Sequence, residues 1–400
     1  MKGPTMSTPV AGLGRSAAPL RVVCVPDSFK GSVSAAAAAE AMASGAQQVF
    51  ADAEILQLPF ADGGEGTLAA LLAAWGKVAE TVEVLDALGR PVTAQYGRSP
   101  DGRIGVIEAA QANGLPQVAD QPLQPLHADS WGVGLIAREL LADPHCEEIL
   151  LCIGGSATTD GGTGVLRGLG ARFLDAEGQE VEPGGTGLAN ISTVDLSGLH
   201  PRATEVRWRI AVDVDNPLTG PQGAAAIFAP QKGATAAEVD LLDAGLDHLA
   251  KVLAHHSDAE PEHLRSTPGY GAAGGLPVTL AVLLGAEVIP GAQMVAEALN
   301  LEQVLADADL VLTGEGSFDT QSLGGKVVHA VRRYAPASAA VVVVAGTVAL
   351  SAQECRQAGI TAAFSIAQGP AELAELLHLA PELIEEAAAQ ACGLLTQQIG

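Results

Sequence analysis

Residues 148–164 read EILLCIGGSATTDGGTG, an apolar run followed by a loop of glycine, hydroxyl and acidic residues. The same arrangement occurs twice more: ILQLPFA leads into DGGEGT at 62–67, and ADLVL leads into TGEGSFD at 313–319. A short apolar run followed by glycine is typical of a buried strand that ends in a tight turn. The sequence therefore predicts three strand ends that each carry polar groups.

Around these runs, β-branched segments alternate with segments rich in alanine and leucine. Strands are expected at 20–26, 53–61, 310–314, 340–346 and 362–366, and helices at 34–49 with Ser34 as N-cap, at 67–75, near 325–334, near 351–358 and at 371–398. This alternation predicts a doubly wound parallel sheet. Residues 82–110 differ, because turns at LGRP and SPDGR favour antiparallel strands there.

A chain of 400 residues is too long for one ordinary core, which predicts two domains. We expect an α/β protein in which residues 20–80 and 290–400 form the doubly wound domain and residues 81–289 form an inserted mixed α/β domain. Residues 1–19 lack the continuous apolar core of a signal peptide and are expected to be a flexible N-terminal extension.

The formal net charge of −25 makes nucleic acids and anionic membranes poor partners, because such a surface repels polyanions. Against this charge, three of the few lysines, Lys30, Lys232 and Lys326, lie beside glycine in polar loops. They suggest local neutralisation of a bound anion, although solvated turn lysines are the alternative. The five cysteines show no CxxC spacing, which favours free thiols in a reducing cytoplasm over disulfides or a zinc site.

In parallel sheets, ligands bind beyond the carboxyl ends of the strands, where all three glycine loops are expected to lie. Glycine-rich loops offer backbone N–H groups to phosphate, and carboxylates suit Mg²⁺. Phosphoryl transfer needs both, so the pattern predicts a nucleotide-dependent kinase of a small substrate. For each loop taken singly, a turn without a ligand is the alternative. The segment AVDVDNP at 211–217 adds acids at another strand end, where an Asp/Asn-Pro turn without a function is an equal alternative.

Seven motifs together resemble the bacterial type I glycerate kinase family. They are PDSFKGSVSA (26–35), ADGGEGT (61–67), IGGSATTDGGTG (153–164), DVDNPLTGPQGAA (213–225), PQKGA (230–234), GAAGGL (271–276) and LTGEGSFDTQSLGGK (312–326). The resemblance implies ATP-dependent phosphorylation of D-glycerate with Mg²⁺ in the cytoplasm, with 2-phosphoglycerate favoured over 3-phosphoglycerate as product. It also implies that the doubly wound sheet is flavodoxin-like and that the active site lies between the two domains.

The expected roles can be assigned to individual residues as hypotheses. The nucleotide-binding set is Gly154, Gly155, Ser156, Thr158, Thr159, Gly161, Gly162 and Gly314, and the candidate magnesium ligands are Asp62, Glu65 and Asp319. Lys30 or Lys326 would neutralise the transferring phosphoryl group or the glycerate carboxylate. Asp160 or Asp213 would accept the hydroxyl proton, with Asp160 ranked first for its place in the glycine loop.

Two other functions remain open from the sequence: a kinase of another small hydroxy acid, and a non-catalytic protein that senses a nucleotide or a carboxylate. Intact acids in every loop favour an enzyme over a sensor. The expected partners are the small molecules glycerate and ATP, without nucleic acid or membrane. The sequence leaves the oligomeric state open, a homodimer included.

Overall fold

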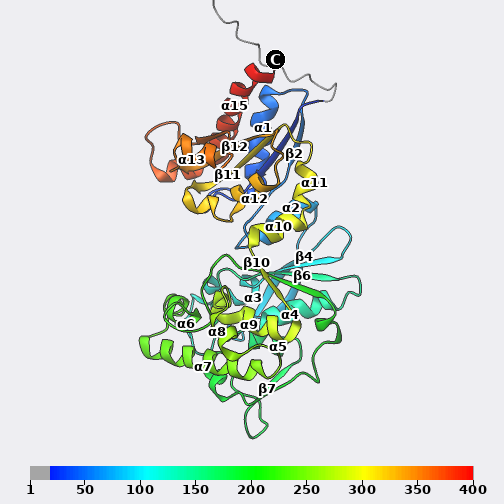
Figure 1. The fold of residues 1–400 in the computed structure, drawn as a ribbon, viewed down its shortest axis with the longest axis vertical. Coiled ribbons are helices and arrows are strands. Elements are labelled where there is room, and N and C mark those ends of the chain that lie inside the picture. The colour runs from blue at the N-terminus through cyan, green and yellow to red at the C-terminus, as the bar shows by residue number, and fades with distance from the viewer. Residues whose placement is uncertain (1–18, 400) are drawn as a thin grey trace, which may run out of the picture.

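The computed structural model describes residues 19–399, so the expected N-terminal extension falls outside the described residues except for its last position. Figure 1 shows two lobes stacked along the long axis of the molecule, each built around its own sheet. The upper lobe contains both ends of the described chain, and the lower lobe contains its middle. This arrangement matches the two-domain α/β architecture expected from the sequence.

The upper lobe contains a five-stranded sheet in which all neighbours are parallel. Its strands are β1 (Arg21–Pro26), β2 (Glu54–Gln57), β11 (Leu310–Phe318), β12 (Ala340–Val348) and β13 (Ala362–Ser365), in the order β13-β12-β11-β1-β2. Counted along this lobe, the order is 2-1-3-4-5, which is that of flavodoxin-like folds. The expected flavodoxin-like sheet is thereby confirmed.

Helices cover both faces of this sheet. They are α1 (Ala35–Val49), α12 (Val327–Tyr334), α13 (Ala352–Gln357) and α15 (Ala380–Ile399), whereas α14 (Leu373–His378) buries no residue and contacts α15. Helix α1 begins where expected, with the Ser34 hydroxyl accepting a hydrogen bond from Ala37 N at 3.2 Å. The single helix expected at 371–398 is wrong: it is split into α14 and α15. Pro381 explains the break, because it has no N–H and its ring would clash with a carbonyl four residues earlier.

The lower lobe contains a six-stranded mixed sheet. Its strands are β3 (Glu80–Leu85), β4 (Pro91–Arg98), β5 (Ile104–Glu108), β6 (Glu148–Cys152), β9 (Arg207–Ala211) and β10 (Glu287–Ile289), in the order β10-β9-β6-β5-β4-β3. Strands β3, β4 and β5 pair antiparallel, as the turns predicted, and the remaining pairs are parallel. A separate two-stranded ribbon pairs β7 (Arg172–Leu174) with β8 (Thr193–Asp195).

Further helices surround the lower sheet or join the lobes, and one of them, α11, packs against α12 of the upper lobe. They are α2 (Thr67–Trp75), α3 (Ala110–Asn113), α4 (Trp131–Leu141), α5 (Thr163–Gly168), α6 (Ala224–Phe228), α7 (Ala236–Ala254), α8 (Pro261–Ser266), α9 (Leu276–Leu284), α10 (Gly291–Ala298) and α11 (Leu301–Leu305). Helices α2 and α10 lie at the waist between the lobes in Figure 1.

One apolar cluster runs through this waist. It includes Val23 and Val311 of the upper sheet, Leu71 of α2, Met294 of α10, and Leu150 and Ala211 of the lower sheet. The two sheets are therefore packed against shared helices. We propose the domain division 20–80 with 290–400 and 81–289, because all strands of the upper sheet fall in the first set and β3 begins at the boundary.

Candidate active site

The strand register in the upper lobe brings acids together at one edge of the sheet. Pro26 pairs with Gly314, and Asp27 N donates to Gly314 O at 2.8 Å, so Asp27 and Glu315 follow side by side. Beyond β2 the chain continues along β1, where Phe60 N donates to Pro26 O at 3.0 Å, and Asp62 follows. Strands β1 and β11 form the switch point of this sheet order, where doubly wound folds bind ligands.

The lower lobe adds Asp213, which lies two residues beyond β9. Its Oδ1 accepts a hydrogen bond from Gly291 N at 2.9 Å. The DGGEG loop of the upper lobe lies against the same place: a β-carbon added at Gly63 would lie 2.6 Å from both Gly291 Cα and Ala211 Cβ. Gly63 also has a φ of +90°, which L side chains rarely adopt. Glycine at this position therefore permits the close contact that brings Asp62 and Asp213 to one site.

The start of the loop Gly154–Gly164 also reaches this place. A β-carbon added at Gly154 would lie 3.4 Å from Gly64 Cα and 3.7 Å from Glu65 N. Within the described chain, the backbone N–H groups of Gly154, Gly155 and Glu65 have no hydrogen-bond partner. Unpaired amides from two adjoining glycine turns are groups that can bind an anion.

The acids at this site repel one another. Burial raises the pKa of Asp27 to about 7, and the charges of Asp62 and Glu315 add to the rise. Desolvation by the surrounding loops raises the pKa of Asp213 to about 6, and the charge of Asp62 adds to the rise. The hydrogen bond from Gly291 N and the charge of Lys326 lower this pKa. Burial likewise raises the pKa of Glu315, with Asp319 and Asp62 adding and Lys326 opposing. Lys326, the N-cap residue of α12, thus acts on acids from both lobes.

Glu315 has a side-chain oxygen without a hydrogen-bond partner. It is only 7% exposed, and its Oε1 is buried without a partner. A buried carboxylate oxygen without a donor is costly, so it marks a position that a cation or a donor group would complete. We refer to Asp27, Asp62, Asp213 and Glu315 as the acid cluster.

The three expected magnesium ligands do not form a closed cage. Asp319 Oδ1 accepts from Gln321 N at 2.8 Å and so caps a short turn, and Glu65 is exposed. Within residues 19–399, no group of three or more His, Cys, Asp or Glu side chains is placed to hold a metal ion. Mg²⁺ in phosphoryl-transfer sites is usually held by one or two carboxylates together with substrate phosphates. The orphaned Glu315 oxygen and the repulsion among its neighbours fit that arrangement.

The interior of the loop Gly154–Gly164 has a different character. Asp160 is fully buried, and its carboxylate accepts four hydrogen bonds: from Ser130 N (2.9 Å), Ser130 Oγ (2.6 Å), Gly162 N (3.1 Å) and Gly164 N (3.2 Å). A carboxylate with this many donors is well suited to fixing a loop, and its burial closes it to a substrate hydroxyl. These contacts favour a structural role for Asp160.

The other expected nucleotide contacts within this loop are enclosed as well. Ser156, Thr158, Thr159, Gly161 and Gly162 are buried, whereas Gly154 and Gly155 are exposed. Gly162, at a φ of +77°, packs so tightly on α9 that an added β-carbon would lie 2.5 Å from Leu276 O. Only the first two glycines of the loop are therefore placed to contact a ligand directly.

Lys232, one of the three lysines that suggested neutralisation of a bound anion, packs against this loop. It is 2% exposed, and its Nζ donates to Thr158 O at 2.6 Å and to Ser156 Oγ at 3.2 Å. Burial lowers the pKa of Lys232 to about 8, and the nearby Asp160 charge opposes this. The lysine ties the loop from below and does not face a ligand.

Lys30 and Gly314 are two further residues that were expected at the site. Lys30 is exposed, and its backbone nitrogen would lie 3.5 Å from a β-carbon added at Gly316, so it borders the acid cluster. Gly314 is buried inside β11, where an added β-carbon would lie 1.9 Å from Val344 O. The glycine at 314 therefore serves strand packing. Asp27 and Glu315 are functional candidates that the residue assignments from sequence omitted, although both follow the same strand-end pattern.

The family model for the glycerate kinase family matches residues 22–396. The chain belongs to the glycerate kinase family. It is 42% identical over 371 residues to the glycerate kinase of Bacillus subtilis, covering 92% of this chain and 96% of the relative. It is 41% identical over 350 residues to the glycerate 2-kinase of Escherichia coli, covering 87% and 90%.

A solved structure of a family member has the same fold. The crystal structure of a putative glycerate kinase 2 from Salmonella typhimurium superimposes with a TM-score of 0.84 at 39% identity, covering 95% of this chain and 99% of the other. None of the helices described here is long and apolar enough to cross a membrane.

Proposed function

We propose that this protein transfers the γ-phosphoryl group of ATP to the 2-hydroxyl of D-glycerate, giving 2-phosphoglycerate and ADP. The observation that carries the proposal is the meeting of the acid cluster, Lys326 and three unpaired backbone amides at the switch point of the flavodoxin-like sheet. Membership of the glycerate kinase family supports the choice of substrate, and the name of the Escherichia coli relative supports the 2-position.

Asp213 is the better candidate for the base that accepts the hydroxyl proton. Its carboxylate is exposed at the meeting point of the lobes, and its pKa of about 6 leaves it ionised at neutral pH yet basic enough to take a proton. Asp160, the first choice from sequence, is enclosed by its four donors. We therefore move the proposed role from Asp160 to Asp213.

The amides of Gly154, Gly155 and Glu65 are the proposed phosphate contacts, since they have no partner within the described chain. The first N–H groups of α2 are less suited, because Leu68 N already donates to Glu108 Oε1 at 2.8 Å. Lys326 would place a positive charge beside the transferring phosphoryl group or the glycerate carboxylate. Ser156, Thr158 and Thr159 would support this loop from behind.

Glu315 and Asp62 are the proposed carboxylates that share Mg²⁺ with the nucleotide phosphates. The donor set fits because it consists of hard oxygen atoms and because Glu315 Oε1 lacks a partner. Bound there, the ion would neutralise charge on the phosphate oxygens. Asp319 and Glu65 are not proposed as direct ligands of Mg²⁺, because Asp319 caps a short turn and Glu65 is exposed.

We also propose that the protein works in the cytoplasm. All five cysteines are buried free thiols, which is consistent with a reducing cytoplasm. A homodimer stays a hypothesis that light scattering of the purified protein tests.

Phosphorus NMR of the product formed from ATP and D-glycerate tests the reaction and its position together. We expect a 2-phosphoglycerate signal with stoichiometric ADP. A 3-phosphoglycerate signal would correct the position, and faster turnover with another small hydroxy acid would correct the substrate. Nucleotide binding without any phosphorylated product would instead support the sensor function.

A further inference from the structure

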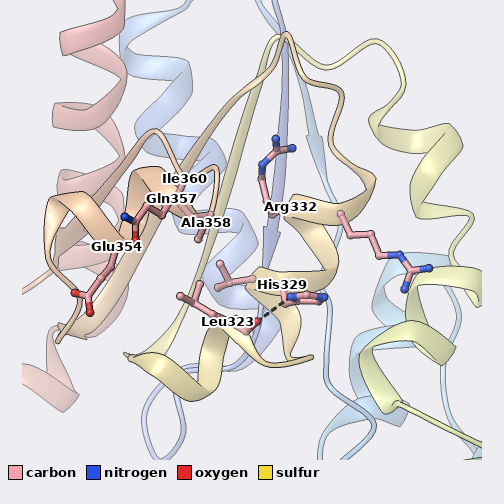
Figure 2. A pocket seen from close by; sticks show the side chains of 9 residues that line it. Leu323, His329, Arg332, Glu354, Gln357, Ala358 and Ile360 are labelled. Atoms are coloured by element: carbon pink, nitrogen blue, oxygen red, sulfur yellow. Dashed lines mark hydrogen bonds between the residues drawn. The ribbon is translucent and has the colours of Figure 1, made fainter.

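A pocket of about 510 Å³ lies between α12 and α13, away from the acid cluster. Figure 2 shows His329 and Arg332 on one side of it and Glu354 and Gln357 on the other. Its remaining lining is Leu323, Val328, Arg333, Ala358 and Ile360. The lining thus includes apolar residues, two arginines and a histidine. Its volume lies in the range of small-molecule sites.

The arginines beside this pocket differ from those of the rest of the described chain. Most arginines form an ion pair with a carboxylate, including strongly exposed ones such as Arg103 with Glu147 and Arg172 with Asp195. Among residues 19–399, four arginines form none: Arg138, Arg332, Arg333 and Arg356. Three of these four belong to α12 and α13, the helices that flank the pocket.

This concentration is notable in a chain of net charge −25, where carboxylates outnumber cations by more than two to one. The one acid of the lining, Glu354, offsets only one of the two arginine charges; its Oε2 accepts from Ser351 N at 2.8 Å and from Ser351 Oγ at 2.7 Å, capping α13. Arg332 uses one donor on Ala335 O at 3.3 Å, and Arg333 lies over the Tyr334 ring at 5.7 Å. The pocket therefore keeps an unneutralised positive charge.

We propose that this pocket binds a phosphate ester of a small molecule, at a site separate from the acid cluster. Guanidinium groups match phosphate oxygens in charge and in hydrogen-bonding geometry. Inorganic phosphate alone would leave most of the volume empty, whereas an organic part would cover the half-buried Leu323 and Ala358. A phosphorylated acid and a nucleotide share this chemistry, and the test below separates them.

Helix α12 and the turn before it connect the pocket to the acid cluster. Leu323 and Val328 line the pocket, and Lys326 lies between them in sequence as the N-cap residue of α12. His329 Nδ1 lies 2.9 Å from Leu323 O, which ties the helix to the preceding turn (Figure 2). A ligand held by α12 and Leu323 would therefore fix the segment that positions Lys326.

Isothermal titration calorimetry with D-2-phosphoglycerate and, separately, ADP tests the site by stoichiometry. The key variant is Arg333→Gln, because Arg333 is exposed and its ring contact is with the adjacent Tyr334. Arg332→Gln is the second variant, although Arg332 also packs on Gly359. Arg172→Gln is the matched control, since it removes an exposed arginine from the lower lobe.

We expect the wild type and Arg172→Gln to bind one of the two phosphorylated probes at two sites, and D-glycerate, which has no phosphate, at one. Arg333→Gln should keep the first site and weaken the second at least tenfold, with kcat and the KM for ATP unchanged. The probe that fills the second site identifies the organic part. One binding site in the wild type, two unchanged sites in Arg333→Gln, or a raised KM for ATP in that variant would each overturn the proposal.

Discussion

The interior of the loop Gly154–Gly164 and the acid cluster both place carboxylates at strand ends, yet their surroundings differ completely. Asp160 has four donors for its two oxygens and no exposed surface. Glu315 has a buried oxygen with no donor, and Asp27 and Asp213 have raised pKa values. Both regions have the same kinds of residues, so residue composition does not distinguish a structural carboxylate from a reactive one. The number of hydrogen bonds that each carboxylate accepts does distinguish them.

The largest effect is expected from Asp213→Asn. Removing the proposed base should lower kcat by roughly 10²–10⁴-fold, because the amide cannot accept the hydroxyl proton. Thermal stability should change little, because the asparagine oxygen can still accept the hydrogen bond from Gly291 N. Coupled ADP-release kinetics measure the change. Asp215→Asn is the matched control, since Asp215 is exposed two residues further on; equal losses in the two variants would contradict the assignment.

Lys326→Met should lower kcat by roughly 10²–10³-fold, because it removes a positive charge from the phosphoryl-transfer site. The same change should raise the pKa values of Asp213 and Glu315, whose charges Lys326 now favours. Steady-state kinetics across pH measure both. Lys251→Met, which removes a lysine paired with Asp247 on the surface, should leave both quantities near wild type.

Asp160→Asn should act mainly on folding. The substitution replaces one accepting oxygen with an NH₂ group, which would face N–H or O–H groups that also donate. This should lower the unfolding free energy by about 1–3 kcal/mol. Urea unfolding measures this. Asp27→Asn is the comparison variant: a buried carboxyl whose pKa is raised to about 7 gains nothing from its charge, so its neutral amide should not destabilise at pH 8. An unchanged unfolding free energy for Asp160→Asn would count against the scaffold role.

The pH dependence should be smaller. Asp213 must be ionised to accept a proton, and desolvation raises its pKa to about 6, so kcat/KM should rise with pH through that value. At pH 5 the activity should be about tenfold below its plateau. Asp27, with a pKa of about 7, titrates nearby, so Asp213→Asn is needed to separate the two. Persistence of the full pH dependence in that variant would assign it to Asp27.

The sequence predicted the fold well where one local rule decided the outcome. Ser34 caps α1, and α2 spans the expected residues, because capping and apolar periodicity act over a few residues. The final helix was predicted as one element because its apolar pattern continues through the proline that divides it. The convergence of the three glycine loops also followed from a general rule of parallel sheets.

The strand-end rule leads to the position of the proposed site, but it does not lead to the roles proposed for its residues. The enclosure of Asp160 could not be predicted locally, since two of its four donor groups belong to Ser130, a residue of another segment. Lys232 sits in a loop that resembles a solvated turn, and its burial arises only from tertiary packing. Asp27 could have been found, because it directly follows a predicted strand in the motif PDSFKG.

The most direct test of the central claim compares single-turnover phosphoryl transfer in Asp213→Asn and Asp160→Asn, each normalised to the fraction folded. If the acid cluster performs the chemistry and the interior of the glycine loop supports it, Asp160→Asn should stay within about tenfold of wild type, while Asp213→Asn falls by about 100-fold or more. A folded Asp160→Asn variant that loses as much rate as Asp213→Asn, or more, would contradict the account.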